Sequence, residues 1–231
     1  MITIRTTVLV FPLMAALAFG PTSAGDIVGK VKYAGTAPAP AKIQVTKDQA
    51  VCGKVEHSDE SFLVGPDKGV KNVVVNIADP KDDKKYSTGQ KPSLDQNGCK
   101  FVPHIDIVPA GQEVDIINSD GILHNIHTFP KSNPPFNKAQ PKFKKTMPAV
   151  FEKPDIVQIK CDVHSWMSGW IVVAGHAYYA LTDVAGNFKI AGVPAGAYTL
   201  EYWHEKLGKQ SKQITVPATG SVTADLEYPA K

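Results

Sequence analysis

The segment from Asp155 to Val173 constrains the fold more than any other part of the sequence. Apolar and polar residues alternate over Val157–Cys161, and this period of two is typical of a β-strand with one buried face. A second apolar run, Trp170–Val173, follows directly after Gly169. The sequence therefore predicts two strands joined by a tight loop, with the thiol of Cys161 directed into the interior of a β-structure.

The loop between these two strands carries side chains that bind soft metal ions. Cys161, His164 and Met167 lie within seven residues, and His124-Asn125 stands upstream at the end of another predicted strand. One thiolate, two imidazoles and one thioether form the ligand set of an electron-transfer copper site. We therefore predict a site for one copper ion.

Short strands and turns are expected over the rest of the chain. Eighteen prolines and eighteen glycines, with little helical periodicity, favour an all-β protein. Apolar runs at 29–35 and 73–75 are typical strands, and the charged, turn-rich stretch 79–97 is a candidate domain boundary. Residues 128–154 are rich in Pro and Lys with little periodicity, so we expect a long loop there that lies over the candidate site.

The N-terminus has the features of a secretory signal peptide. Arg5 precedes an apolar run over Val8–Phe19, and Thr22-Ser23-Ala24 offers small residues for cleavage. A retained membrane anchor is the alternative, although the apolar run is short for a span. We expect residues 1–24 to be removed and the mature chain, without a membrane span, to be periplasmic or secreted.

An exported chain with three cysteines enters a compartment in which thiols pair. If Cys161 holds a metal ion, Cys52 and Cys99 remain to form a disulfide with each other. Two unpaired thiols are one alternative. A disulfide that includes Cys161, and so removes the metal site, is the other.

Charge and motifs argue against several other functions. The formal net charge is +3 and arises from scattered lysines, without the basic stripe and interleaved aromatic residues of a nucleic-acid-binding protein. The sequence contains no Gly-x-Ser-x-Gly motif, and no carboxylate pair stands out. A copper enzyme would need an open coordination position or a second metal, and no second cluster is evident. We therefore do not expect an enzyme.

The pattern around the loop resembles the cupredoxin family. It reads Cys161-x-x-His164-x-x-Met167-x-Gly169-x-Ile171-x-Val173, with Asn118 and His124-Asn125 upstream. The resemblance implies a Greek-key β-sandwich that binds one copper ion. It implies that His124, Cys161 and His164 are the strong ligands and that Met167 is the axial ligand. It also implies that Asn125 braces the cysteine loop by hydrogen bonding.

The resemblance spans residues 94–174 and has two departures. Only two residues separate His164 from Met167, a spacing that also resembles the binuclear copper domain of cytochrome oxidase. That domain requires a second loop cysteine, which is missing here, so one copper ion is expected. His127 lies three residues after His124, where strand side chains face opposite ways, and we treat it as a possible additional ligand.

The last third of the chain resembles a different family, the carboxypeptidase-regulatory-like, transthyretin-type sandwich. The motif is Thr182-Asp183-x-x-Gly186-x-Phe188-x-Ile190-x-x-Val193-Pro194-x-Gly196. The opening strand of such a sandwich would lie far upstream, at 29–35. We therefore expect a copper domain at 94–174 inserted into a small sandwich formed by 25–93 and 175–231. An N-terminal composite followed by a C-terminal hairpin domain is the alternative.

These features together predict an exported, single-copper electron carrier. A cytochrome or another oxidoreductase would dock near the exposed edge of a ligand histidine such as His164. Copper delivery or storage without electron transfer is one alternative function, and a structural sandwich with a vestigial metal site is another. The redox partner, the potential and the oligomeric state stay open at this level.

Overall fold

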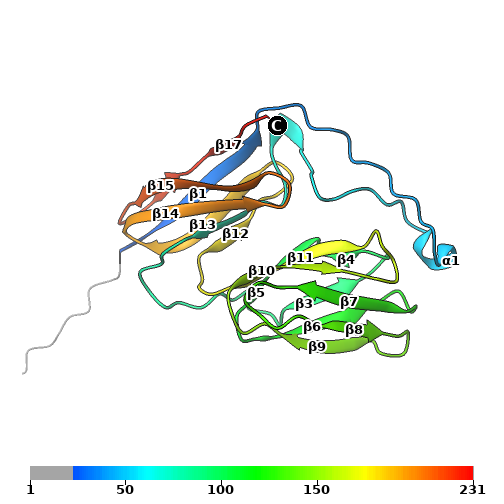
Figure 1. Cartoon of the computed structure of the whole chain (residues 1–231). Helices are drawn as coiled ribbons and strands as arrows, with labels where there is room; N and C mark the ends of the chain where they lie inside the picture. The colour runs from blue at the N-terminus through cyan, green and yellow to red at the C-terminus, as the bar shows by residue number, and fades with distance from the viewer. Residues whose placement is uncertain (1–22, 231) are drawn as a thin grey trace, which may run out of the picture.

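The computed structural model describes residues 23–230 and contains two β-sandwiches (Figure 1). The predicted all-β fold class is confirmed, since the helices are limited to α1 (Gln49–Cys52) and the 3-10 turn η1 (Pro66–Lys68) in the described part of the chain. In the same part of the chain, no helix is both long and apolar enough to span a membrane. Residues 1–22 of the predicted signal peptide lie outside the described residues.

The first sandwich is built from strands at both ends of the chain. One sheet has the order β13-β1-β16, with β17 also paired to β1, and the other has the order β12-β2-β14-β15. The strands are β1 (Ala24–Tyr33), β2 (Val74–Ile77), β12 (Tyr179–Leu181), β13 (Asn187–Pro194), β14 (Gly196–His204), β15 (Gly208–Val216), β16 (Ser221–Thr223) and β17 (Leu226–Tyr228).

Period-two patterning explains the core of the first sandwich. Tyr198, Leu200 and Tyr202 of β14 are buried on one face, and residues of both sheets pack against them. The turn before β13 forms because the Asp183 carboxylate accepts hydrogen bonds from two later backbone N–H groups. Gly186 is required there, since its φ is +80° and a Cβ would lie 2.2 Å from a carbonyl oxygen of β1.

The second sandwich contains the nine strands between β2 and β12. Its sheets have the orders β5-β11-β10-β7-β8 and β4-β3-β6-β9, and their inner faces share one core. The strands are β3 (Ser93–Gln96), β4 (Phe101–Val102), β5 (Ile105–Pro109), β6 (Glu113–Asn118), β7 (His124–Phe129), β8 (Asn137–Gln140), β9 (Thr146–Val150), β10 (Asp155–Lys160) and β11 (Ser168–Ala174).

The strand order places the second sandwich inside the sequence of the first. The flanking strands β2 and β12 pair with each other, with Asn76 opposite Tyr179, so the chain leaves and re-enters the first sandwich at neighbouring strands. An inserted domain would give this arrangement. The predicted domain boundaries and the carboxypeptidase-regulatory-like assignment stay predictions.

The stretch 128–154 differs from the long loop that its weak periodicity suggested. It forms β8 and β9, which lie at the edges of the two sheets beside β7 and β6. Only alternate residues of β9, Met147 and Ala149, are buried. Edge strands with mostly exposed side chains carry a weak apolar pattern, which is why the sequence did not reveal them.

A long arm of the chain crosses from the first sandwich to the second. We define the arm as residues 41–59, because Ala41 and Asp59 are joined by a backbone hydrogen bond of 2.9 Å at its base. Figure 1 shows it running out to α1 and back. A disulfide between Cys52 and Cys99 attaches the arm to the second sandwich.

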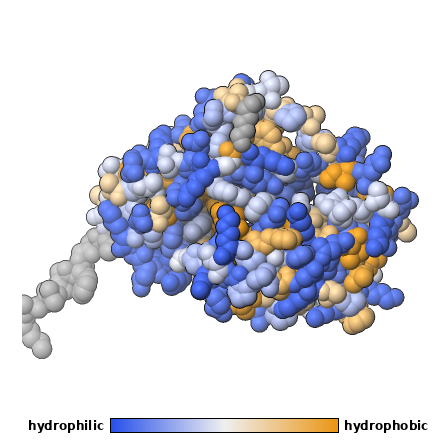
Figure 2. Space-filling view, viewed as in Figure 1, coloured by the Kyte–Doolittle hydropathy of each residue, from blue (hydrophilic) through white to orange (hydrophobic). Residues whose placement is uncertain are grey.

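The two sandwiches also contact each other directly. Val74 of β2 and Trp203 of β14 face β5 and β11 of the second sandwich, where they join a separate apolar cluster. The rings of Trp170 and Trp203 are 4.9 Å apart. On the face shown in Figure 2, hydrophilic residues cover most of the surface and apolar residues form small, scattered groups.

Candidate metal centre

Three of the predicted ligands meet at one end of the second sandwich. His124 is the first residue of β7, Cys161 directly follows β10, and His164 lies in the loop between β10 and β11. The two Nδ1 atoms are 3.0 Å apart, and the Cys161 Sγ lies 3.9 Å from His124 Nδ1 and 3.8 Å from His164 Nδ1. All three side chains are buried, with at most 2% exposure. One thiol and two imidazole nitrogens therefore converge on a single point.

Met167 is buried in the same core, and its backbone closes the ligand loop. Its N–H donates to the His164 carbonyl at 2.9 Å, and its own carbonyl accepts from the Cys161 N–H at 3.2 Å. These bonds keep the loop to one tight turn before β11. The thioether thus lies within the shell of apolar residues that surrounds the ligands.

His127 lies away from the three converging side chains. Its Nδ1 is 3.1 Å from a carboxylate oxygen of Asp162, and its side chain is one-third exposed. His124 and His127 are three residues apart on a continuous strand, so their side chains leave opposite faces. The structure therefore separates His127 from the cluster that contains His124.

Asn125 holds the ligand loop from the neighbouring strand. Its Oδ1 accepts hydrogen bonds from the backbone N–H groups of Asp162, at 2.7 Å, and Val163, at 3.3 Å. The thiol of Cys161 is also 3.3 Å from this oxygen. One buried amide thus fixes the backbone on which Cys161 sits.

Each clustered histidine contacts a carboxylate through its other ring nitrogen. His124 Nε2 lies 2.8 Å from Asp120, and His164 Nε2 lies 2.8 Å from Asp48. Because a carboxylate oxygen only accepts, each Nε2 carries a proton and donates it. In the neutral imidazole the Nδ1 lone pair then points at the cluster, as in carboxylate–histidine–metal arrangements.

Sequence reasoning missed both of these carboxylates. Asp120 lies in the turn-forming stretch Asn118-Ser119-Asp120-Gly121, and its position four residues before His124 was the one available signal. Asp48 is 116 residues from His164 in sequence, and nothing local to either residue indicates the contact. Such a pairing follows from the path of the arm, which depends on the Cys52–Cys99 disulfide.

The electrostatics of the cluster favour the ligand forms of Cys161 and His164 but hold a proton on His124. Burial opposes a charged His124, but hydrogen bonds to Asp120 and Cys161 outweigh it and raise its pKa to about 9. Burial also opposes a thiolate, but His124 and nearby N–H groups bring the pKa of Cys161 below its ordinary value. The pKa of His164 is lowered, chiefly by burial. A metal ion that binds here displaces the proton of His124 and meets a sulfur with thiolate character.

The remaining cysteines form the disulfide rather than a second metal group. Cys99, Asp120 and His124 also lie close together, but the Cys99 sulfur is bonded to Cys52. Cys161 is the one free cysteine, which the predicted role of a metal ligand requires. The structure therefore contradicts the alternative of a disulfide through Cys161.

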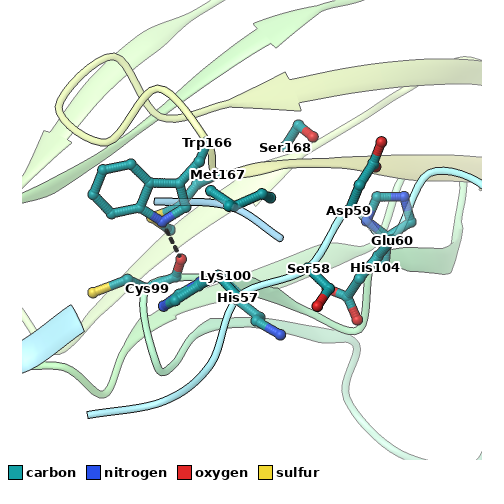
Figure 3. Close-up of a pocket in the computed structure, with 11 residues that line it drawn as sticks. His57, Ser58, Asp59, Glu60, Cys99, Lys100, His104, Trp166, Met167 and Ser168 are labelled. Atoms are coloured by element: carbon teal, nitrogen blue, oxygen red, sulfur yellow. Dashed lines mark hydrogen bonds between the residues drawn. The ribbon is translucent and has the colours of Figure 1, made fainter. Parts of the chain in front are cut away.

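A small cavity of about 30 Å³ lies next to the ligand loop. It is bounded by residues 57–60, where the arm ends, on one side and by Met167 and Ser168 on the other (Figure 3). The indole Nε1 of Trp166 donates to the Cys99 carbonyl at 3.2 Å beside it. This volume admits water but is too small for an organic substrate.

The expected docking edge of His164 is covered in this structure. His164 is fully buried, and the Asp48 carboxylate lies against its Nε2. The sequence-based expectation of an exposed His164 edge is therefore wrong. The physical reason is the arm, which comes from residues outside the pattern on which the expectation was based.

Comparisons with known proteins find similarity at the level of partial structure. Neither a family model nor a curated protein matches the sequence. A copper-containing nitrite reductase (NirK) from Thermus scotoductus SA-01 is 22% identical, with a TM-score of 0.34 over 37% of this chain. This chain spans only 22% of that reductase.

Two smaller copper proteins are also similar. A purple cupredoxin from Nitrosopumilus maritimus is 20% identical, with a TM-score of 0.32, over 36% of this chain and all of that chain. A mutant of amicyanin in the Cu(I) state is 17% identical, with a TM-score of 0.33, over 43% of this chain and 98% of that chain.

Proposed function

We propose that this chain is an exported protein that binds one copper ion and transfers electrons. The observation that carries the proposal is the buried convergence of Cys161 Sγ with the Nδ1 atoms of His124 and His164, which lie between 3.0 and 3.9 Å from one another. A thiolate suits Cu(I) and imidazole suits both oxidation states, so this donor set fits copper.

The side chains of the cluster would bind the ion, and the groups around them would keep these ligands in place. His124 and His164 would supply imidazole nitrogens, Cys161 would supply the thiolate, and Met167 would supply a weak thioether ligand. When bound, the copper ion supplies a one-electron couple between Cu(I) and Cu(II). Burial and the hydrogen bonds of Asn125 keep the ligands in place, so little rearrangement accompanies each transfer.

We also propose where the protein acts, with which kind of partner, and what its first sandwich is. The N-terminal sequence supports export to the periplasm or outside the cell. The electron partner would be a cytochrome or another oxidoreductase. The first sandwich, formed from both ends of the chain, is proposed to be the carboxypeptidase-regulatory-like domain, with the copper domain inserted into it.

Spectroscopy of the purified, copper-loaded protein tests the proposal. We expect one copper per chain, an intense visible thiolate-to-Cu(II) band and reversible voltammetry. Cys161→Ser and His124→Ala should abolish the band, because each removes a ligand. The control, His127→Ala, should retain it, because His127 faces Asp162 instead.

The outcomes separate the competing functions. Loss of the band in His127→Ala together with its survival in His124→Ala would show that the wrong histidine is assigned. Ready loss of Cu(I) to a chelator, without reversible voltammetry, would favour copper delivery or storage. A chain that takes up no copper on reconstitution would favour a structural sandwich with a vestigial site.

A further inference from the structure

The arm brings a negative charge from outside the ligand cluster to the back of one ligand. Asp48 Oδ2 lies 2.8 Å from His164 Nε2, on the side of the ring opposite the Nδ1 that faces Cys161. His164 is fully buried, and the Asp48 side chain is 39% exposed. The imidazole is thus held between the ligand cluster and a carboxylate on the surface.

The arm has enough internal structure to hold Asp48 in one place. A backbone hydrogen bond of 2.9 Å from Ile43 to His57 joins its outgoing and returning halves. The carbonyl of Asp48 accepts from the N–H of Cys52 at 2.9 Å, and the His57 ring donates to the Cys52 carbonyl at 2.9 Å. Asp48 is therefore tied through its own backbone to the cysteine that anchors the arm.

The other end of the same disulfide leads to the second carboxylate. The N–H groups of Gly98 and Cys99 donate to Asp120 at 2.6 and 2.8 Å, and Asp120 in turn accepts from His124 Nε2. The Cys52–Cys99 bond thus connects the segment that carries Asp48 with the backbone that hydrogen-bonds to Asp120. Both imidazoles are connected to one crosslink.

We propose that the arm positions and tunes the copper site. Asp48 fixes His164 with Nδ1 toward the ion and places a negative charge behind the ring. The Cys52–Cys99 disulfide keeps Asp48 and Asp120 against their histidines. This inference rests on the proposed function, because it assumes copper at the ligand cluster, and it names positioning residues that the ligand pattern does not contain.

The expected effect follows from charge. A carboxylate behind a ligand imidazole makes the nitrogen a stronger donor. The attraction is greater for Cu(II) than for Cu(I), because it grows with the charge of the ion. Asp48 should therefore lower the reduction potential, and its hydrogen bond should slow the loss of the ion.

Two substitutions at Asp48 separate its charge from its hydrogen bond. The residue has φ 50° and ψ 40°, a left-handed conformation that Asn and Gly both adopt readily. Asp48→Asn keeps an acceptor but removes the charge. It should change the ratio of Cu(II) to Cu(I) affinity about tenfold, which corresponds to a potential about 59 mV more positive. Asp48→Gly removes both and should weaken copper binding about 10- to 100-fold.

Glu56→Gln is the matched control. Glu56 lies on the same arm, and its side chain is 71% exposed and paired with Lys42. The substitution removes one negative charge without touching a ligand. We expect its potential and copper affinity to equal those of the wild type, as measured by voltammetry and by competition with a Cu(I) chelator.

A double-mutant cycle tests the role of the disulfide. In the Cys52→Ala/Cys99→Ala background, the potential shift caused by Asp48→Asn should fall by about half or more, because the arm no longer holds the carboxylate in place. If this background does not fold, the single substitutions at Asp48 decide the question.

The results distinguish this inference from the proposed function. If the wild type binds one copper with a thiolate band, but Asp48→Asn shifts the potential no more than Glu56→Gln and Asp48→Gly keeps full affinity, the arm has no tuning role. The copper function would then still stand. If the wild type takes up no copper, the proposed function itself is wrong.

Discussion

At the scale of single residues, Asn125 is the side chain on which the ligand loop most depends. It is 5% exposed and accepts from two backbone N–H groups of that loop. Asn125→Ala would leave those groups without their partner, at a cost of about 1–3 kcal/mol in unfolding free energy. Urea unfolding of the metal-free protein measures this loss. Asn97→Ala, at an exposed turn, serves as the control, and an equal loss there would contradict the role given to Asn125.

Asp106 is a half-buried carboxylate with a predictable effect on stability. Its Oδ2 has no hydrogen-bond partner among the described residues, and burial raises its pKa from 3.8 to about 6. The folded state binds the Asp106 proton more tightly than the unfolded state does. The protonated side chain therefore adds to the unfolding free energy below about pH 4, and this added stability is lost as the pH rises to about 6. Asp106→Asn should therefore raise the unfolding free energy by about 2–3 kcal/mol at about pH 8.

The test compares urea unfolding of the wild type and Asp106→Asn at about pH 4 and about pH 8, on either side of the raised pKa. The difference between the two proteins should be large at the higher pH and small at the lower. Asp115→Asn is the control, since Asp115 pairs with Lys91 near the surface. A gain from Asp106→Asn that is the same at both pH values would contradict the raised pKa of this carboxylate.

The residues that the sequence made visible are those with a local pattern. Cys161 follows Val157 and Ile159 with a period of two, so its inward direction could be predicted, and it is buried. Asp120 and Asp48 could not be found in this way. Their contacts with the histidines depend on a turn and on an arm that is distant in sequence, and neither has a periodic signal.

At the scale of elements, the arm depends on its crosslink. Cys52 and Cys99 are 47 residues apart in sequence, and on the chain-entropy model such a loop closure contributes roughly 4 kcal/mol. The Cys52→Ala/Cys99→Ala variant should lose about this much unfolding free energy in urea at neutral pH. Cys161→Ala, which leaves the disulfide intact, is the control in the metal-free protein. An unchanged midpoint in the double variant would show that the arm is held by packing alone.

Strands with one buried face were predictable, whereas edge strands and the arm were not. β10 and β11 have strong apolar patterns and lie where their patterns suggested. β8 and β9 have few buried positions, so 128–154 was expected to be a loop. The short helix α1 follows no periodic signal, because four residues are too few to show one.

At the scale of the whole molecule, the two sandwiches are joined by a contact that neither resemblance implied. Trp203 lies on the face of β14 opposite its buried tyrosines and packs on Trp170 of the second sandwich. Next to it, His104 Nε2 lies 2.5 Å from a Glu205 oxygen, and both side chains are at most 10% exposed. The interface therefore combines an aromatic contact with a buried polar pair, which favours unfolding of the two sandwiches as one unit.

Trp203→Ala should uncouple the two sandwiches. The truncation removes the ring that fills the contact, and a half-buried Trp lost in this way costs about 2–3 kcal/mol. In calorimetry the wild type should unfold in one transition, whereas the variant should unfold in two, because each sandwich keeps its own core.

Phe143→Ala is the control, since this ring is 80% exposed and its loss should change stability by no more than about 0.5 kcal/mol. A single transition in Trp203→Ala, shifted no more than in the control, would mean that the arm and its disulfide couple the sandwiches without help from the aromatic contact.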